Sequence, residues 1–221
     1  MLLDLMRGSF TMADAIIHLF VIFLMIFLIL PVHEFGHATV ALLLGDNSIR
    51  GRGRLSLNPM AHIDIMGALS MLLIGFGWAK PVPVNPLNFK RPRLYFAITA
   101  LAGPLSNILC AMLGGAVYIA IIKIDPMFFI TKFGYYLLVF LGYYISINVS
   151  LAVFNLIPVP PLDGSKVLCL FLPQEAERFF YRYGNYIFFG FIAILYLGVL
   201  DGPIDYLTGI LFNFCTFSFL L

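Results

Sequence analysis

Long charge-free apolar stretches limit what this chain can fold into more than any other feature of its sequence. Leu94–Ile122 and Phe133–Leu162 contain no Asp, Glu, Lys or Arg, and each exceeds the roughly 20 residues that a helix needs to cross a bilayer. Only 11% of the residues are charged, against about 25% in soluble domains. These features exclude a soluble globular enzyme and a disordered chain, and a net charge of +2 gives no footprint for nucleic acid. The sequence predicts an all-α, multi-pass membrane protein.

Three further stretches bring the expected number of membrane helices to about five or six. Ala15–Val32 and Tyr183–Leu200 are also free of charged residues. Tyr206–Leu221 is charge-free but would be only about 24 Å long as a helix, so we expect it either to cross a thinned bilayer or to lie along the interface. We expect one membrane-embedded domain over residues 1–221, with a catalytic core at about 12–166 and C-terminal helices at about 183–221.

The short, glycine-rich segment Ile65–Ala79 can be read as a crossing or as a re-entrant loop between the first two core helices. If the segment dips in and returns, ten of the thirteen Lys and Arg residues lie on one face of the membrane; if it crosses, they divide between the two faces. Because basic loops prefer the cytoplasmic side, the charge distribution favours the re-entrant loop. The ten residues are Arg50, Arg52, Arg54, Lys80, Lys90, Arg91, Arg93, Lys166, Arg178 and Arg182.

The sequence His33-Glu34-Phe35-Gly36-His37 lies near the end of the first apolar run. On a helix, residues four apart share a face, so both imidazoles can reach one metal ion. Glu34 lies roughly 100° around the helix from His33, which suits contact with a neighbouring water molecule. A polar patch that closes the helix at the interface is the alternative explanation. Ionisable residues at membrane depth favour a functional site.

A catalytic zinc site needs a third protein ligand, and acidic residues are scarce in this chain. Asp163 follows the third long apolar stretch in Asn155-Leu-Ile-Pro-Val-Pro-Pro-Leu-Asp163-Gly164. With a re-entrant 65–79 segment, Asp163 and the histidine pair fall on the same half of the membrane; with a crossing segment they would lie on opposite halves. On spacing alone, a turn residue in Leu-Asp-Gly is an equally good interpretation of Asp163.

Taken together, these motifs resemble those of the site-2 protease family of intramembrane zinc metalloproteases. The resemblance rests on HEFGH, on Gly103-Pro-x-x-Asn107 and on NLIPVPPLDG, and runs from about Leu30 to Lys166. It is closest to the subgroup that lacks PDZ and CBS domains. It implies one zinc ion as cofactor and Glu34 as catalytic base. The zinc ligands it implies are His33, His37 and Asp163, and the substrate-binding candidates are Asn155 and Asn107.

The expected function is therefore that of an intramembrane zinc endopeptidase that hydrolyses a peptide bond in or near a transmembrane segment of another protein. The expected partners are a membrane-protein substrate and the lipid bilayer, without nucleic acid. The subgroup resemblance implies a plasma-membrane location with the active site opening to the cytoplasm. A metal transporter and an inactive binding scaffold could use the same ligands. A metallopeptidase of another HExxH family would need a glutamate ligand, and Glu175 and Glu177 lie in a charged loop.

Overall fold

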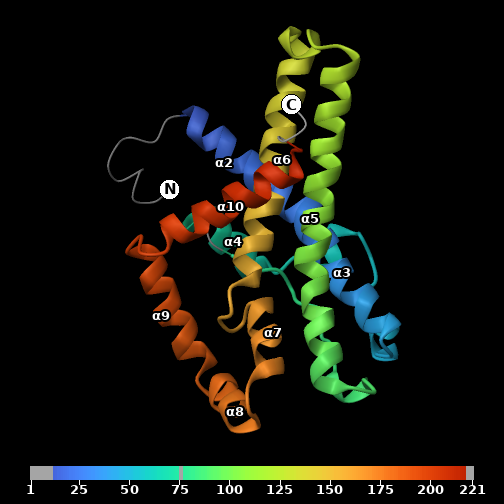
Figure 1. The fold of residues 1–221 in the computed structure, drawn as a ribbon, viewed down its shortest axis with the longest axis vertical. Coiled ribbons are helices and arrows are strands. Elements are labelled where there is room, and N and C mark those ends of the chain that lie inside the picture. Colours follow the sequence, from blue (N-terminus) through green and yellow to red (C-terminus); the bar gives the residue numbers. More distant parts are fainter. Residues whose placement is uncertain (1–11, 75–76, 218–221) are drawn as a thin grey trace.

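The computed structural model describes residues 12–74 and 77–217, and within these ranges every regular element is helical (Figure 1). This confirms the predicted all-α fold class. In chain order the elements are α2 (Met12–Leu24), η1 (Met25–Ile29), α3 (Leu30–Leu43), η2 (Asn47–Arg52), η3 (Pro59–Ala61), α4 (Ile65–Ile74), η4 (Pro86–Asn88), α5 (Pro92–Ile124), η5 (Phe128–Ile130), α6 (Lys132–Leu156), α7 (Asp163–Phe171), α8 (Gln174–Arg182), α9 (Gly184–Tyr196) and α10 (Asp201–Cys215).

Three helical stretches in the described part of the chain are long and apolar enough to cross a membrane. They are Leu19–Leu43, Pro92–Ile124 and Lys132–Leu156. The pair α9 and α10 is bent by 87° and adds a fourth span if it is counted as one broken crossing. The expected total of five or six therefore stays a prediction. The predicted segment Tyr206–Leu221 lies partly in α10, and residues 218–221 are outside the described ranges.

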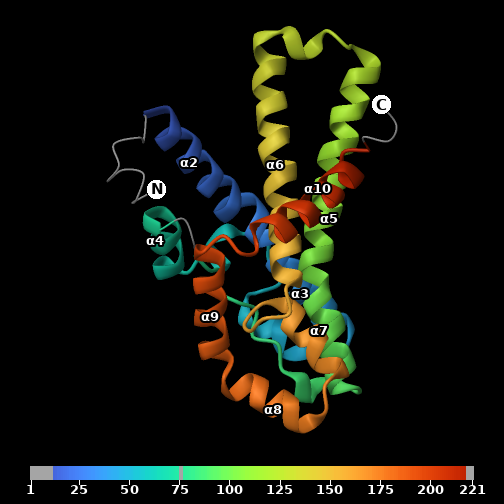
Figure 2. The same cartoon turned by 60° about the vertical axis from the view of Figure 1, so that its left-hand side comes forward.

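The two longest helices form the frame on which the other elements pack. α5 and α6 run side by side and are joined by η5, and α10 lies across both of them (Figures 1 and 2). On α5, the large side chains of Leu105, Leu109 and Leu113 are exposed at four-residue intervals, which places them on one face. The polar side chain of Asn107 is buried instead. This distribution suits a helix that faces lipid outward and polar groups inward.

The first span contains a π-helical turn directly before the HEFGH segment. In η1, the Leu30 N–H donates to the carbonyl of Met25, five residues back. Pro31 follows at once, and a proline ring clashes with the carbonyl four residues before it in a regular α-helix. The wider turn accommodates Pro31, so that α3 continues without a break through His33 and His37.

The segment that could cross or return has its two ends joined by a hydrogen bond. The Lys80 N–H donates to the carbonyl of His62 over 2.8 Å. Within the segment, a Cβ on Gly67 would lie 2.0 Å from the carbonyl oxygen of Trp78. Only a residue without a side chain permits this backbone approach. The glycine-rich composition thus serves close packing between the start of α4 and the chain that follows it.

Asp46, at the end of the first span, anchors the extended chain after Lys80. Its carboxylate accepts hydrogen bonds from the backbone N–H of Asn85 at 2.8 Å, from Asn88 Nδ2 at 2.6 Å and from Ser48 Oγ at 2.6 Å. Burial favours the neutral acid, but these hydrogen bonds lower the pKa of Asp46 below its ordinary value. The ionised carboxylate therefore ties residues 85–88 to the end of α3.

We predict that Asp46→Asn lowers the thermal unfolding midpoint at pH 7. The NH₂ group of the new asparagine would face hydrogen-bond donors where the carboxylate offered an acceptor. Each lost hydrogen bond to a charged group costs about 2 kcal/mol of stability. Because the pKa of Asp46 is lower in the folded protein than in the unfolded chain, its ionised carboxylate stabilises the fold fully above the unfolded pKa of about 3.9. This contribution to the free energy of unfolding is lost as the pH falls through the pKa of the folded state. The difference between wild type and variant should accordingly narrow below pH 4. Circular dichroism melts in detergent measure it, with Asp205→Asn, an exposed carboxylate in α10, as the control. Equal midpoints at pH 7 would contradict the assignment.

Candidate metal centre

Three buried side chains from two helices converge on one point. His33 and His37 lie one turn apart on α3, and Asp163 is the first residue of α7. The exposed fractions of the three residues are 4%, 8% and 5% respectively. The Nε2 atoms of the two histidines are 3.1 Å apart, and Asp163 Oδ2 lies 3.3 Å from the first and 3.1 Å from the second. The predicted histidine pair and the predicted third residue are thus brought together.

The dimensions of this triangle fit a tetrahedral zinc ion. Zinc binds imidazole nitrogen and carboxylate oxygen at about 2.0–2.2 Å, so two ligand atoms on a tetrahedron should lie about 3.3 Å apart. The observed edges of 3.1–3.3 Å match this value. No other group of three His, Cys, Asp or Glu side chains in the described residues meets the same requirement.

Hydrogen bonds on the far side of each imidazole define which nitrogen is free to bind a cation. His37 Nδ1 lies 2.7 Å from the carbonyl oxygen of Thr99, and His33 Nδ1 lies 2.6 Å from Asn107 Oδ1. Both oxygens can only accept, so each Nδ1 carries the proton. The two Nε2 atoms then present lone pairs to the centre, as a metal ligand must.

Asp163 uses its second carboxylate oxygen for a separate contact. Oδ1 accepts a hydrogen bond from Lys166 Nζ at 2.7 Å, three residues later on α7. Lys166 thus gives the buried carboxylate a cationic partner that favours its ionised form. The carboxylate is therefore ionised and held with Oδ2 toward the histidines.

Glu34 lies beside the triangle without being part of it. The residue is 8% exposed, and its Oε2 accepts a hydrogen bond from the backbone N–H of Val82 at 3.0 Å. Val82 belongs to the extended chain that Asp46 anchors at Asn85. Glu34 is not part of the cluster of His33, His37 and Asp163, and its expected contact with a neighbouring water molecule stays a prediction.

Gly103 explains why α5 can approach the metal centre so closely. A Cβ on this residue would lie 2.4 Å from His37 Nε2 and 2.6 Å from His33 Nε2, well inside van der Waals contact. The absence of a side chain leaves the ligand atoms uncovered. The glycine of the Gly-Pro-x-x-Asn sequence thus keeps the centre open, while Asn107, four residues later, supports His33.

The two predicted substrate-binding asparagines have different surroundings. Asn107 is buried and contacts His33 directly. Asn155 Nδ2 donates to the carbonyl of Leu151 in its own helix, and its role stays a prediction. Sequence reasoning missed Thr99, Val82, Lys166 and Asn148. Thr99 and Val82 act through backbone atoms and leave no trace in residue type. Asn148 could have been found from the sequence, because it is a second asparagine, besides Asn155, in the charge-free run before Asp163.

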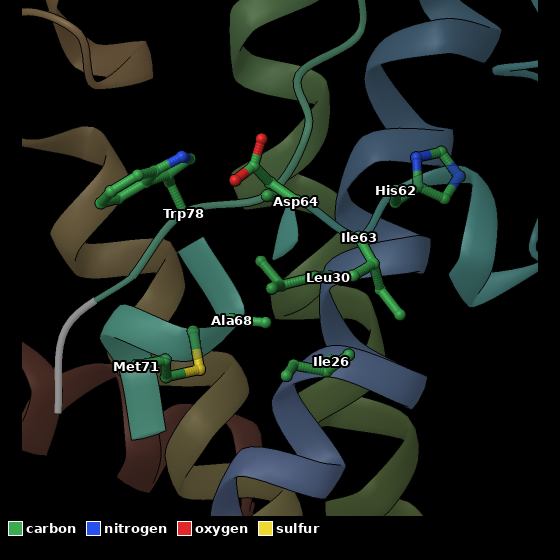
Figure 3. A pocket seen from close by; sticks show the side chains of 9 residues that line it. Ile26, Leu30, His62, Ile63, Asp64, Ala68, Met71 and Trp78 are labelled. Carbon is green, nitrogen blue, oxygen red and sulfur yellow. The ribbon is translucent and has the colours of Figure 1, made fainter. Parts of the chain in front are cut away.

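A pocket lies beside the residues that precede His33, between the first span and residues 62–79 (Figure 3). Ile26 and Leu30 line it from η1 and α3, opposite Ala68 and Met71 of α4. His62 lies at its edge and is not part of the cluster of His33, His37 and Asp163. Its Nε2 atom contacts the carbonyl of Ser56 at 2.7 Å. The remaining lining residues are Ile63, Asp64, Trp78 and Ala79.

Comparisons with known proteins point to zinc metallopeptidases, the class of protein that the geometry of this site also suggests. The family model described as "Peptidase family M50" matches residues 113–198, which include Asn155 and Asp163. The chain is 38% identical over 167 residues to "Putative zinc metalloprotease YwhC" of Bacillus subtilis (strain 168), an alignment that covers 76% of this chain and 74% of that protein. No solved structure matches the chain.

Two mycobacterial proteins, each named "Putative zinc metalloprotease Rip2", match a shorter part. The identity is 32% over 154 residues for Mycolicibacterium smegmatis and 33% over 155 residues for Mycobacterium tuberculosis, and each alignment covers 67% of this chain and 56% of the relative. The chain therefore belongs to peptidase family M50, the site-2 protease family of zinc metalloproteases, and the resemblance seen in the sequence is confirmed.

We predict that Gly103→Ala abolishes metal binding, because the added methyl group would collide with both Nε2 atoms. Zinc content of the purified protein, measured by atomic emission, should fall from about one ion per chain to near zero. Gly142→Ala in α6 is the matched control, since a Cβ there meets no atom within 4 Å. Unchanged zinc content in Gly103→Ala, with normal helicity, would show that α5 does not lie against the ligands as described.

Proposed function

We propose that this protein is an intramembrane zinc endopeptidase that hydrolyses a peptide bond in or near a transmembrane segment of a protein substrate. The observation that carries the proposal is the triangle of His33, His37 and Asp163 with Glu34 beside it, placed next to membrane-spanning helices. Those three residues would hold one zinc ion. Zinc supplies Lewis-acid chemistry to such a site, activating water and polarising a carbonyl group.

The protein's own groups carry the proton transfers. The Glu34 carboxylate takes a proton from the attacking water and passes it to the leaving amine. The Val82 N–H holds Oε2 of this carboxylate, which orients it before a substrate arrives. We assign Asn155 to the substrate backbone or the developing oxyanion, a contact typically worth about 3 kcal/mol. Because Asn107 bonds to His33, we assign it to ligand orientation in addition to the substrate contact expected from its motif.

The finer topology belongs to the same proposal. A re-entrant 65–79 segment is supported by the hydrogen bond between Lys80 and His62, which brings its two ends together. It is also supported by the short length of α4, which is ten residues, too few to cross a bilayer. With this loop, the basic segments lie on one face, which we assign to the cytoplasm of a plasma-membrane protein. Residues 1–221 then form one domain with about five or six membrane helices.

The expected partners follow from the setting of the site. The substrate is a second membrane protein, and the bilayer supplies it by lateral diffusion. A metal transporter would need polar ligands on both halves of the membrane, whereas the described residues hold one such cluster, formed by the later part of the first span and the start of α7. A scaffold that only binds zinc would not need a buried Glu34 beside it.

We predict that Glu34→Gln retains about one zinc ion per chain and loses peptide hydrolysis, since the amide cannot accept the proton. Wild type and Glu34→Gln are each reconstituted into liposomes with solubilised bacterial membrane proteins, and new N-termini are identified by mass spectrometry. Wild type should produce cleavages inside or next to transmembrane segments that Glu34→Gln lacks. Identical sets of N-termini from the two proteins, both loaded with zinc, would overturn the endopeptidase proposal.

We further predict that Asp163→Ala lowers zinc affinity about 100-fold or more, because a three-ligand site becomes a two-ligand site. Competition with a chromogenic chelator measures the dissociation constant. Asp201→Ala, an exposed acid at the start of α10, is the control. An unchanged dissociation constant in Asp163→Ala would show that Asp163 is not the third zinc ligand.

A further inference from the structure

A chain of buried amides connects the metal centre to the backbone of α6. His33 Nδ1 lies 2.6 Å from Asn107 Oδ1, Asn107 Nδ2 donates to Asn148 Oδ1 over 3.0 Å, and Asn148 Nδ2 donates to the carbonyl of Tyr144 over 2.9 Å. Both asparagines are 1% exposed. The chain joins α3, α5 and α6, and the peptidase chemistry described above makes no use of Asn148.

The direction of every hydrogen bond in this chain follows from its last member. The Tyr144 carbonyl can only accept, so the NH₂ group of Asn148 must face it and the Asn148 oxygen must face Asn107. The NH₂ group of Asn107 then turns toward that oxygen, which leaves Oδ1 of Asn107 for His33. Since this oxygen also only accepts, the proton of the His33 imidazole is placed on Nδ1 and the lone pair on Nε2.

A single carboxamide could not impose this order by itself. Oxygen and NH₂ of an asparagine are interchanged by a half-turn of the side chain, and a reversed Asn107 would offer its NH₂ group to His33 Nδ1. The imidazole proton would then lie on Nε2, the nitrogen that faces His37 and Asp163. A protonated Nε2 has no lone pair left to bind a cation. We propose that Asn148 is a positioning residue: through Asn107 it fixes the His33 tautomer that binds zinc. This inference rests on the proposed function.

The test is a double-mutant cycle on zinc affinity. Asn148→Ala removes the group that orders Asn107, and we expect the zinc dissociation constant to rise about tenfold or more, the range found when groups supporting a ligand are lost. In Asn107→Asp protein, either carboxylate oxygen can accept from His33 Nδ1, and the Asn148 oxygen would face a second acceptor in place of an NH₂ group. Asn148 then no longer supports the order, so adding Asn148→Ala to Asn107→Asp should leave the dissociation constant unchanged or lower it. Ser150→Ala, an exposed residue of the same helix, is the control.

A purely structural role for Asn148 gives a different pattern. Damage to packing between α5 and α6 would weaken zinc binding equally in both backgrounds, and that result would overturn the proposal. An unchanged affinity in Asn148→Ala alone would overturn it as well. Circular dichroism of the metal-free variants shows whether each has kept its helices.

A second readout separates this inference from the proposed function. The readout uses metal-free protein that carries His37→Ala and Asp163→Ala, because both residues would otherwise attract a proton to His33 Nε2. With ¹⁵N-histidine labelling, the His33 signals, identified by their absence after His33→Ala, report which ring nitrogen carries the proton. We expect protonated Nδ1 in this background and a mixture of tautomers when Asn148→Ala is added. If Nδ1 is protonated there but the wild type binds no zinc, the proposed function fails and the positioning role stands. The same tautomer in both proteins would overturn the positioning role, whatever the zinc affinity.

Discussion

Keeping ionisable side chains inside a bundle that faces lipid is the constraint on which the rest of the structure depends. An unpaired polar group at such depth costs several kcal/mol, so each side chain of the metal centre needs a partner on its far side. The structure provides a different kind of partner for each. They are Asn107 for His33, the Thr99 carbonyl for His37, Lys166 for Asp163 and the Val82 N–H for Glu34.

These partners explain the arrangement of elements around the centre. α5 supplies two of them, and Gly103 lets it approach the histidines without a side chain in between. The extended chain after Lys80 supplies the Val82 N–H, and Asp46 fixes that chain to the end of α3 through Asn85. Glu34 and the three residues of the candidate metal centre therefore receive their hydrogen bonds from separate parts of the fold, so that loss of one support need not disturb the other.

Much of the candidate site could be predicted from the sequence because its chemistry is carried by residue type. His33 and His37 share a helical face at a spacing of four, and Asp163 is one of few acids next to an apolar run. Helical spacing cannot reveal contacts made by backbone atoms, which is why the Thr99 carbonyl and the Val82 N–H were missed. Pro31 marks a local irregularity in the first apolar run, but its π-helical form depends on how the chain relieves the clash and cannot be read from residue type.

The fold was predictable to the same extent. Charge-free runs indicated helices α5 and α6 because hydrophobic length alone decides whether a helix can cross a bilayer. The run that was expected to continue to Leu162 ends as a helix at Leu156, where the residues before three prolines leave the helical conformation. The 87° bend between α9 and α10 falls at residues 197–200, where Gly198 takes a left-handed conformation with φ +71°. A glycine marks where the chain can turn, but the angle of the turn cannot be read from residue type.

X-ray absorption at the zinc K-edge is the decisive measurement on the candidate metal centre, because it reports which atoms surround the ion. Protein loaded with one equivalent of zinc should show only nitrogen and oxygen neighbours at about 2.0–2.2 Å, with outer-shell scattering from two imidazole rings. In His37→Ala, the imidazole contribution should fall to one ring. Sulfur at about 2.3 Å, or a spectrum that His37→Ala leaves unchanged, would contradict a centre built from His33, His37 and Asp163.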